Sequence, residues 1–353
     1  MIDWNCHASS VLINPRSPDP TPKLPLEGEF SNHFWVRTSG STGGEKWVAL
    51  NKEAILFSAE AVNQHFNCTA KDIWLHALPN FHVGGLGILA RAHLSGAVVK
   101  RVLEKWDPLK FHNALDGCTL TALVPSQLYD LVKLRLKPPK TIRALIIGGG
   151  ALSDALFDLA KELGWPVCPS YGLTECASQV ATAYPGEREM RILPHVEVRV
   201  SHIISLKSPS LLTAYASDVG GQYEIFDPKS HGVFATEDLG KVNGPFLKVL
   251  GRKGEAVKIG GEFVNLSHLE GVLEREKLQI GFTGEATLVV LPDPRLENSI
   301  HMVTTSRDIS RLVCLYNEKV YPYEQIRNIH YFPKIPKTPL GKISKDLIIS
   351  QIK

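Results

Sequence analysis

Between residues 73 and 171 the chain alternates short apolar segments with longer amphipathic ones, and this alternation restricts the fold more than any other feature. Fully apolar runs such as A-L-I-I at 144–147 are typical of strands buried on both faces, which occur in parallel sheets covered by helices. The sequence therefore predicts an α/β fold. The expected strands are 73–77, 97–102, 121–124, 142–147 and 167–171, and the expected helices are 85–94, 108–115, 125–134 and 154–163.

The flanking segments have a different texture. Residues 1–30 contain five prolines, which predicts an extended arm with one short strand at 10–13. Segments 34–37 and 47–50 predict a pair of strands, followed by a helix for which Asn51 is a suitable N-cap. From about residue 195, short glycine-punctuated strands predict an antiparallel, barrel-like part, at 197–200, 223–226, 232–235 and 247–250.

After residue 251 the pattern restarts with a helix at 267–276, strands at 287–291 and 301–305, and a final helix after residue 344. We therefore expect a domain of residues 1–250, a hinge at 251–255 and a second domain of residues 256–353. The second domain combines helices and strands, so we expect it to have an α+β fold.

Composition excludes several classes of protein. The 353 residues carry 39 Lys+Arg against 36 Asp+Glu, a net charge of +3, which is too mild for a dedicated nucleic-acid binder. The six cysteines form no C-x-x-C pair, so neither a disulfide framework nor structural zinc is expected. No signal-peptide pattern is recognised, and the apolar stretches are shorter than the ~20 residues of a spanning helix. We expect a cytoplasmic protein without nucleic-acid or membrane partners.

Hydroxyl and glycine residues are concentrated in the loop between the first two predicted strands, which ends in a lysine. Small side chains leave backbone N–H and hydroxyl groups accessible to phosphate oxygens, and a lysine adds positive charge. The loop is not a Walker loop, because Glu45 and Trp47 break that pattern. A flexible Ser/Gly turn is the alternative for this motif taken alone. The candidate phosphate-binding residues are Thr38, Ser39, Gly40, Ser41, Thr42, Gly43 and Lys46.

Glycine and polar residues also follow later strands. Gly149 and Gly150 lie between an apolar strand and a helix, where bare backbone and a helix N-terminus can receive an anion or a flat ring. Thr174 and Glu175 follow the strand at 167–171 and could hold a phosphate and its Mg²⁺. Asp238 follows another strand and could bind a ribose diol. Tight turns are the alternative interpretation of the glycines and of Asp238, but the order of the motifs makes the combined signal strong.

In this order the motifs resemble those of the adenylate-forming superfamily of acyl-CoA ligases, luciferases and peptide-synthetase adenylation domains, from about residue 34 onward. Segment 38–43 with Lys46 resembles its phosphate loop, and segment 78–85 resembles its acyl-pocket histidine motif. Segment 171–175 resembles its nucleotide and magnesium motif, and segment 336–343 its C-terminal lysine motif. Within the superfamily, segments 78–86, 142–152 and 169–182 are most similar to the 2-succinylbenzoate–CoA ligases of menaquinone synthesis.

The resemblance implies a reaction with two halves. A carboxylate attacks the α-phosphate of ATP to give an acyl-adenylate and pyrophosphate, and the CoA thiol then displaces AMP. It implies ATP, Mg²⁺, CoA and a carboxylic acid as partners, a possible homodimer, and an adenylate-forming fold shortened at its N-terminus, with a mobile C-terminal lid.

The resemblance also implies the site residues, each at the position that matches a family motif. They are, for catalysis, Lys342, Glu175 (which also holds Mg²⁺) and His82; for the nucleotide, Thr38, Ser39, Gly40, Ser41, Thr42, Gly43, Lys46, Gly149, Gly150, Ser170, Tyr171, Gly172, Thr174, Asp238 and Arg252; and for the acid, His82, Gly84, Arg91, Gly149 and Ser178.

The sequence departs from the family pattern at several positions. Glu45 and Trp47 replace proline and glycine in the phosphate loop, Glu237 replaces a glycine before the ribose aspartate, and Gly254 replaces a hinge aspartate. These changes bear on loop rigidity and domain rotation. The alternatives to a 2-succinylbenzoate ligase are another acyl- or aryl-CoA or acyl-carrier ligase, or a non-catalytic nucleotide-binding relative, against which the retained Lys342 argues.

Two of the expected acid-binding residues have simpler interpretations. His82 could be a buried histidine that serves packing alone. Arg91 could be an ordinary exposed arginine on a helix. A structure separates these interpretations by the burial and the partners of each side chain.

Overall fold

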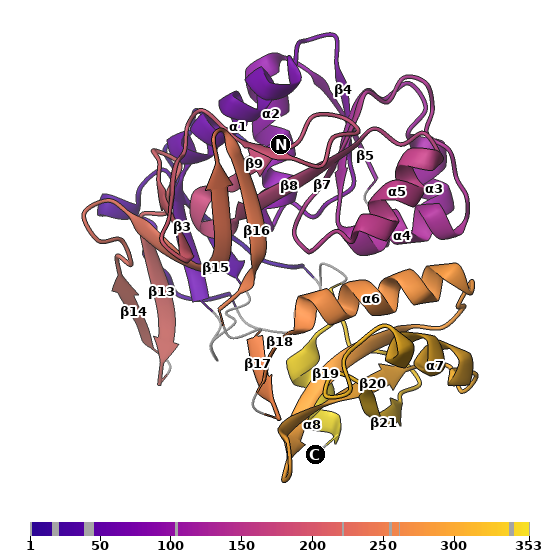
Figure 1. Cartoon of the computed structure of the whole chain (residues 1–353). Helices are drawn as coiled ribbons and strands as arrows, with labels where there is room; N and C mark the ends of the chain where they lie inside the picture. Colours follow the sequence, from indigo (N-terminus) through magenta and orange to yellow (C-terminus); the bar gives the residue numbers. More distant parts are fainter. Residues whose placement is uncertain are drawn as a thin grey trace.

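The computed structural model describes residues 2–15, 21–38, 46–102, 105–220, 222–253, 256–260, 262–338 and 342–352. At the centre, five parallel strands lie in the order β8, β7, β6, β4, β5 (Figure 1). Their bounds are Ile73–His76 (β4), Val98–Arg101 (β5), Leu120–Leu123 (β6), Ala144–Ile147 (β7) and Val167–Leu173 (β8). The predicted parallel sheet is confirmed.

Helices cover both faces of this sheet, because successive residues of a strand point to opposite sides and the residues of β7 are all apolar. Ala144 and Ile146 pack in one cluster with α1 and α2, while Leu145 and Ile147 pack in another with α3, α4 and α5. The helices are Lys52–Phe66 (α1), Val83–Ser95 (α2), Pro108–Ala114 (α3), Pro125–Lys133 (α4) and Asp154–Glu162 (α5). The expected elements between 73 and 171 are confirmed within two residues at each end.

Antiparallel strands extend the same sheet beyond β8, and a second sheet faces them. Phe34 and Val48 of the second sheet share one core with Ile204 and Leu247 of the first, and this pairing is the barrel-like part. The extension consists of β9 (Ser178–Thr182), β10 (Met190–Ile192), β16 (Phe246–Arg252), β15 (Phe234–Asn243), β12 (Ile203–Lys207) and β11 (Glu197–Val200). The second sheet consists of β1 (Ser10–Leu12), β2 (His33–Thr38), β3 (Lys46–Asn51), β13 (Ala214–Val219) and β14 (Gln222–Phe226).

The described part of the N-terminal segment contains the predicted short strand, β1 at Ser10–Leu12, and lies along the second sheet. Trp4 is buried against Phe34, and the ammonium of Lys52 donates hydrogen bonds to the backbone carbonyls of Asp3 and Cys6. A single 3₁₀ turn, η1 (Gly28–Phe30), precedes β2. As predicted, Asn51 caps α1, its side chain accepting from the Glu53 N–H at 2.9 Å.

The C-terminal elements enclose a core of their own. Leu269, Leu288, Ile300 and Leu312 belong to a cluster formed only by residues from 257 onward. The expected final helix is confirmed, whereas the hairpin β17–β18, α7 and β21 were not predicted. The elements are β17 (Ala256–Ile259), β18 (Glu262–Asn265), α6 (Leu266–Gln279), β19 (Ala286–Asp293), β20 (Glu297–Thr304), α7 (Ser310–Glu318), β21 (Ile326–Tyr331) and α8 (Lys345–Ile352).

Helix α6 lies against α4 and α5 of the larger part (Figure 1). The Lys277 ammonium lies 5.2 Å from the centre of the Tyr129 ring, and Lys133 Nζ donates to the Thr283 carbonyl at 3.3 Å. These contacts hold the C-terminal part beside the carboxyl ends of the parallel strands. Among the described residues, none of the helices has the length and apolar character needed to span a membrane.

One ion pair secures the opposite, amino-terminal ends of the parallel strands. Asp72 accepts from Arg143 Nε and Nη2, each at 2.9 Å, and from the Thr119 hydroxyl at 2.8 Å. Burial opposes ionisation, but the hydrogen bonds from Arg143, Thr69 and Thr119 hold the pKa of Asp72 below its ordinary value.

We expect Asp72→Asn to lower the free energy of unfolding at pH 7 by about 1–3 kcal/mol, a modest loss because the Arg143 side chain is 37% exposed and the pair is partly screened. Because the pKa is lower in the folded state, the difference from wild type should shrink as pH falls below about 4. Urea unfolding of both proteins across pH checks this, and a difference that is constant with pH would contradict it.

Candidate functional site

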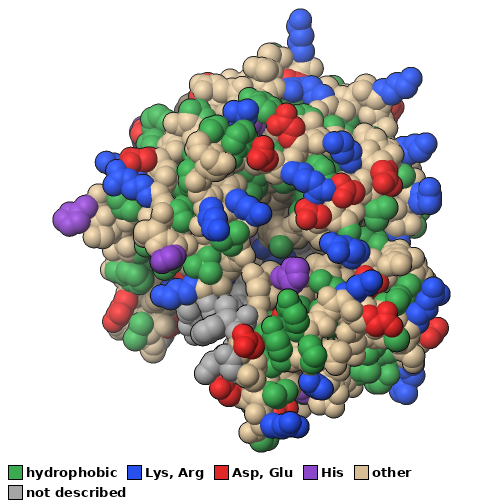
Figure 2. Space-filling model, viewed as in Figure 1, with side chains coloured by type: hydrophobic (Ala, Val, Ile, Leu, Met, Phe, Trp, Pro, Cys, Tyr) green, Lys and Arg blue, Asp and Glu red, His purple; other side chains and the backbone are tan. Residues whose placement is uncertain are grey.

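The carboxyl ends of the parallel strands open toward the C-terminal part, and the polar residues singled out in the sequence gather there. In Figure 2 the face is hollowed between the two parts, with Lys and Arg side chains around the hollow. In parallel sheets this edge is where ligands bind, because helix N-termini and strand-end loops converge on it.

Lys342 reaches this edge from the C-terminal part. Its backbone is bonded to Thr338: the Thr338 N–H donates to the Lys342 carbonyl at 2.6 Å, and the Thr338 hydroxyl accepts from the Lys342 N–H. Its ammonium would be 4.0 Å from a Cβ placed on Gly149. The residue keeps a solvent-exposed surface, yet burial of its ammonium and then the charge of Arg252 lower the pKa of Lys342.

His82 lies near the same ammonium. It is the N-cap residue of α2, and among the described residues its Nε2 atom is buried without a hydrogen-bond partner. Burial, followed by the charge of Lys342, lowers the pKa of His82 to about 4, so the ring is neutral at pH 7. A neutral ring with an unpaired buried nitrogen favours a ligand-facing role over packing alone.

The candidate ribose-binding residues form a group on β8, β15 and β16 that is held by a hydrogen bond and an ion pair. Tyr171 donates to Asp238 Oδ2 at 2.6 Å, and Arg252 Nε lies 3.3 Å from Asp238 Oδ1. Asp238 and Arg252 are directly paired in the β15–β16 ladder. The ladder thus fixes the carboxylate beside the guanidinium, and Glu237 Oε2 lies 3.7 Å from the same Arg252 atom.

A tight irregularity between β8 and β9 positions the nucleotide motif. A Cβ on Gly172 would lie 1.9 Å from the Ser178 carbonyl oxygen, so only glycine fits. Opposite it, Ala177 and Ser178 have positive φ angles of +50° and +117°. The Ser170 hydroxyl is paired with Thr182 at 2.9 Å, which holds the base of the bulge.

Glu175 lies in the 3₁₀ turn η2 (Thr174–Cys176), next to Thr174. One carboxylate oxygen accepts from the Tyr215 hydroxyl at 2.6 Å. The other has no hydrogen-bond partner in the part of the chain that the structure describes. A carboxylate with one available oxygen and neighbouring hydroxyls fits Mg²⁺, which prefers oxygen ligands and keeps several waters alongside one or two carboxylates and substrate phosphates.

Arg91 is only 2% exposed, which rules out the interpretation as an exposed helix arginine. Its Nη2 lies 3.4 Å from the Ser178 hydroxyl, and its guanidinium lies 5.7 Å from the Trp74 ring centre. Within the described ranges it has no carboxylate partner, and its Nε atom is buried without a hydrogen bond. Burial lowers the pKa of Arg91 to about 10, so it is still a cation at pH 7.

The remaining expected residues are placed as follows. Gly84 is in the first turn of α2, beside Leu78, and Gly150 lies beside Pro125. Thr38 and Lys46 face each other across β2 and β3, at the ends of the phosphate loop. Outside the described residues lie Ser39, Gly40, Ser41, Thr42 and Gly43, together with hinge positions 254 and 255.

Sequence reasoning did not identify Tyr215, which touches Glu175 from β13. Nothing in the alternation of that strand distinguishes a tyrosine that packs from one that donates a hydrogen bond. The contact joins residues 40 positions apart, and only the folded chain shows it.

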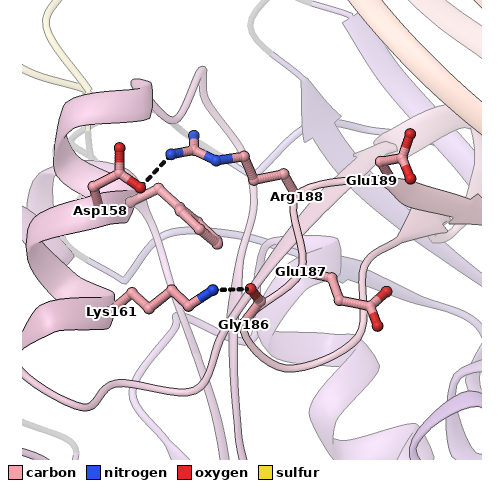
Figure 3. A pocket seen from close by; sticks show the side chains of 7 residues that line it. Asp158, Lys161, Gly186, Glu187, Arg188 and Glu189 are labelled. Carbon is pink, nitrogen blue, oxygen red and sulfur yellow. Dashed lines mark hydrogen bonds and ion pairs between the residues drawn. The ribbon is translucent and has the colours of Figure 1, made fainter.

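A separate surface pocket lies between α5 and the segment after β9 (Figure 3). Arg188 pairs there with Asp158 and also with Asp154, and Lys161 Nζ donates to the Gly186 carbonyl at 3.0 Å. Because these charged groups are paired with one another, the pocket is a weaker candidate than the strand-end hollow.

Comparisons with known proteins point to one family. The model of the family "AMP-binding enzyme" matches residues 17–203. A 2-succinylbenzoate–CoA ligase of Listeria monocytogenes (strain F2365) is 29% identical over 327 residues, which cover 88% of this chain and 68% of the relative. The enzyme of the same name from Listeria innocua is 31% identical with the same coverage. A structure of an E. coli MenE variant with bound OSB-AMS has a TM-score of 0.73 and 26% identity, covering 91% of this chain and 68% of that one.

We expect Gly172→Ala to disrupt the bulge, because the added methyl group would overlap the Ser178 carbonyl and push Tyr171 away from Asp238. The free energy of unfolding should fall by about 1–3 kcal/mol or more, and AMP should bind more weakly. Gly271→Ala is the matched control: it lies within α6 with open space around its Cβ and should be neutral or stabilising. Urea unfolding and AMP titration calorimetry measure both effects; wild-type stability and AMP affinity in Gly172→Ala would refute the steric argument.

Proposed function

Because the chain belongs to the AMP-binding enzyme family, we propose that it is an ATP-dependent acid–CoA ligase that converts 2-succinylbenzoate to 2-succinylbenzoyl-CoA through an acyl-adenylate. This reaction is a step of menaquinone synthesis. The observation that carries the proposal is the convergence of Lys342 with His82, Gly149 and Arg252, because it brings the lysine expected to drive adenylation to the edge where nucleotide and acid would meet.

In the first half-reaction an acid oxygen forms a bond to the α-phosphorus of ATP, and the bond to pyrophosphate breaks. The developing charge on the phosphate oxygens needs preorganised cations. Lys342 and Arg252 supply them at the α-phosphate, and Lys46 supplies one from the phosphate loop. Glu175 would hold Mg²⁺, which neutralises phosphate charge when bound.

The nucleotide is oriented by the residues of β8 and β15. The Asp238 carboxylate, held by Tyr171 and Arg252, is suited to accept the two hydroxyls of a ribose. Gly149 and Gly150 leave backbone exposed for a flat ring. Ser170 and Gly172 keep the bulge that presents Thr174 to a phosphate.

The features around Arg91 support a dicarboxylic acid as substrate. A buried guanidinium without a carboxylate partner is unfavourable unless an anion completes it. 2-Succinylbenzoate carries two carboxylates, so one can react while the other pairs with Arg91 and Ser178. Neutral His82 would then line the acid pocket without attracting the reactive carboxylate away from the phosphorus. Gly84, which has no side chain, leaves room for the acid.

In the second half-reaction the CoA thiol attacks the acyl carbon and AMP leaves. We propose that the C-terminal part, from residue 256 onward, turns about a hinge at 251–255 to withdraw Lys342 and admit CoA. The β15–β16 ladder ends at this hinge, which supports the boundary. We also propose a cytoplasmic enzyme that acts on small molecules, and a homodimer as the assembly to test by sedimentation.

We expect Lys342→Ala to lower pyrophosphate release from ATP, Mg²⁺ and 2-succinylbenzoate by roughly 100-fold or more, since one preorganised cation is lost from the transition state. Thioester formation from supplied acyl-adenylate should change little, because that half-reaction does not use the lysine. Lys345→Ala, in the same segment, is the control and should behave like wild type in both assays.

Two results would count against these assignments. Wild-type pyrophosphate release in Lys342→Ala would remove the lysine from the mechanism. An absence of release from wild type with every acid in a panel, despite measurable ATP binding, would favour a nucleotide-binding protein over an enzyme.

We expect Arg91→Ala to lower kcat/KM for 2-succinylbenzoate roughly 30- to 5,000-fold, the range for losing one partner of a buried charge pair. The same variant should leave kcat/KM unchanged for an aryl acid that lacks the second carboxylate. Steady-state assays with both acids measure this. Equal losses for the two acids would mean that Arg91 supports the fold and does not recognise the distal carboxylate.

A further inference from the structure

Tyr215 connects two parts of the site, Lys46 and Glu175, that come from distant segments of the chain. It lies on β13, is 8% exposed, and packs its ring near Phe226 and Phe234. Its hydroxyl leaves this apolar cluster and donates to Glu175 Oε1 at 2.6 Å. A buried hydroxyl that has one short hydrogen bond to a carboxylate fixes the orientation of that carboxylate.

The backbone strengthens the same connection. The Leu212 N–H donates to the Glu175 carbonyl at 2.8 Å, so segment 212–215 binds Glu175 through both its main chain and its side chain. One oxygen of Glu175 is thereby used, and the carboxylate cannot rotate freely.

The ring of Tyr215 also meets the phosphate-loop lysine. Lys46 Nζ lies 5.3 Å from the ring centre, within the range of a cation–π contact. Lys46 pairs with Ser217 in the β3–β13 ladder, and Tyr215 pairs with Val48, so sheet register holds the lysine over the ring. Tyr215 is thus in contact with both Lys46 and Glu175.

Resting on the proposed function, we propose that Tyr215 is a positioning residue for the Mg²⁺·ATP complex. Its hydroxyl orients Glu175 so that the second carboxylate oxygen faces the metal, and its ring holds Lys46 for the phosphates. The two roles belong to different atoms of one side chain, so substitutions can separate them.

The test measures binding, without turnover, of α,β-methylene ATP, which cannot release pyrophosphate. Calorimetry gives its Kd in saturating Mg²⁺ and in EDTA at matched ionic strength, and the ratio of the two is the gain due to the metal. We expect Tyr215→Phe to reduce this gain roughly 10- to 100-fold while leaving the Kd in EDTA within about twofold. Tyr215→Leu should also weaken binding in EDTA, because Lys46 loses the ring.

A double-mutant cycle tests whether the hydroxyl acts through Glu175. Glu175→Gln should reduce the gain due to the metal, and adding Tyr215→Phe to it should cause no further reduction. Tyr316→Phe is the matched control, because Tyr316 is also buried and hydrogen-bonded, but within the C-terminal part. It should keep the wild-type gain.

The outcomes separate this proposal from the proposed function. If wild type binds the analogue with a clear gain from Mg²⁺ and Tyr215→Phe keeps that gain, the role of Tyr215 is overturned while the ligase proposal stands. Additive losses in the double variant would equally overturn action through Glu175. If wild type gains nothing from Mg²⁺, the proposed function fails, and this role fails with it.

Discussion

The site depends on holding several cations close together at the carboxyl edge of the parallel sheet. Lys342 lies near Arg252 and above Gly149, and both burial and the neighbouring guanidinium act against its charged form. Arg91, on α2 of the larger part, is buried without a carboxylate partner among the described residues. Such an arrangement is costly in the empty protein and becomes favourable when phosphate and carboxylate groups enter. The cations at this edge therefore lack full compensation in the free protein and gain it when a substrate with several negative charges binds.

Holding cations in place requires a rigid support, and the hydrogen-bonded backbone of the sheet supplies it. The parallel strands are buried on both faces, and the bulge between β8 and β9 is packed so closely that a methyl group on Gly172 cannot be accommodated. The β15–β16 register then sets Asp238 beside Arg252. Positions fixed by sheet hydrogen bonds move less than loop positions, so the proposed nucleotide site is preorganised. The lysine, by contrast, belongs to the C-terminal part, which has a core of its own, and in the proposed second half-reaction it leaves with that part.

Local patterns in the sequence predicted the elements between 73 and 171 and the strand ends where polar residues gather, because burial on both faces leaves a continuous apolar run. Motif resemblance supplied the candidate residues, and the structure brings Lys342, His82 and Gly149 together. Patterns could not reveal Tyr215, whose role follows from a contact across 40 residues. Nor could they show that Lys52 ties down the N-terminal segment, because a buried lysine bound to carbonyls has no local signature. The short helix α7 and the strand β21 were missed for the same reason: their burial is decided by the C-terminal core.

Glu237, which replaces the glycine of the family pattern, changes the balance of charge around these cations. A glycine at this position carries no charge, whereas Glu237 sets a second carboxylate 3.7 Å from Arg252, beside that of Asp238. Both Glu237 and Arg252 are about two-fifths exposed, so solvent weakens the pair without removing it. The added carboxylate offsets part of the repulsion between Arg252 and Lys342 before substrate binds. It also reduces the net attraction for a triphosphate. If Glu175 holds Mg²⁺ as proposed, that metal and Lys46 then neutralise a larger share of the phosphate charge. The positioning of Lys46 and Glu175 by Tyr215 should therefore contribute more to ATP binding in this chain than it would in a chain with glycine at position 237.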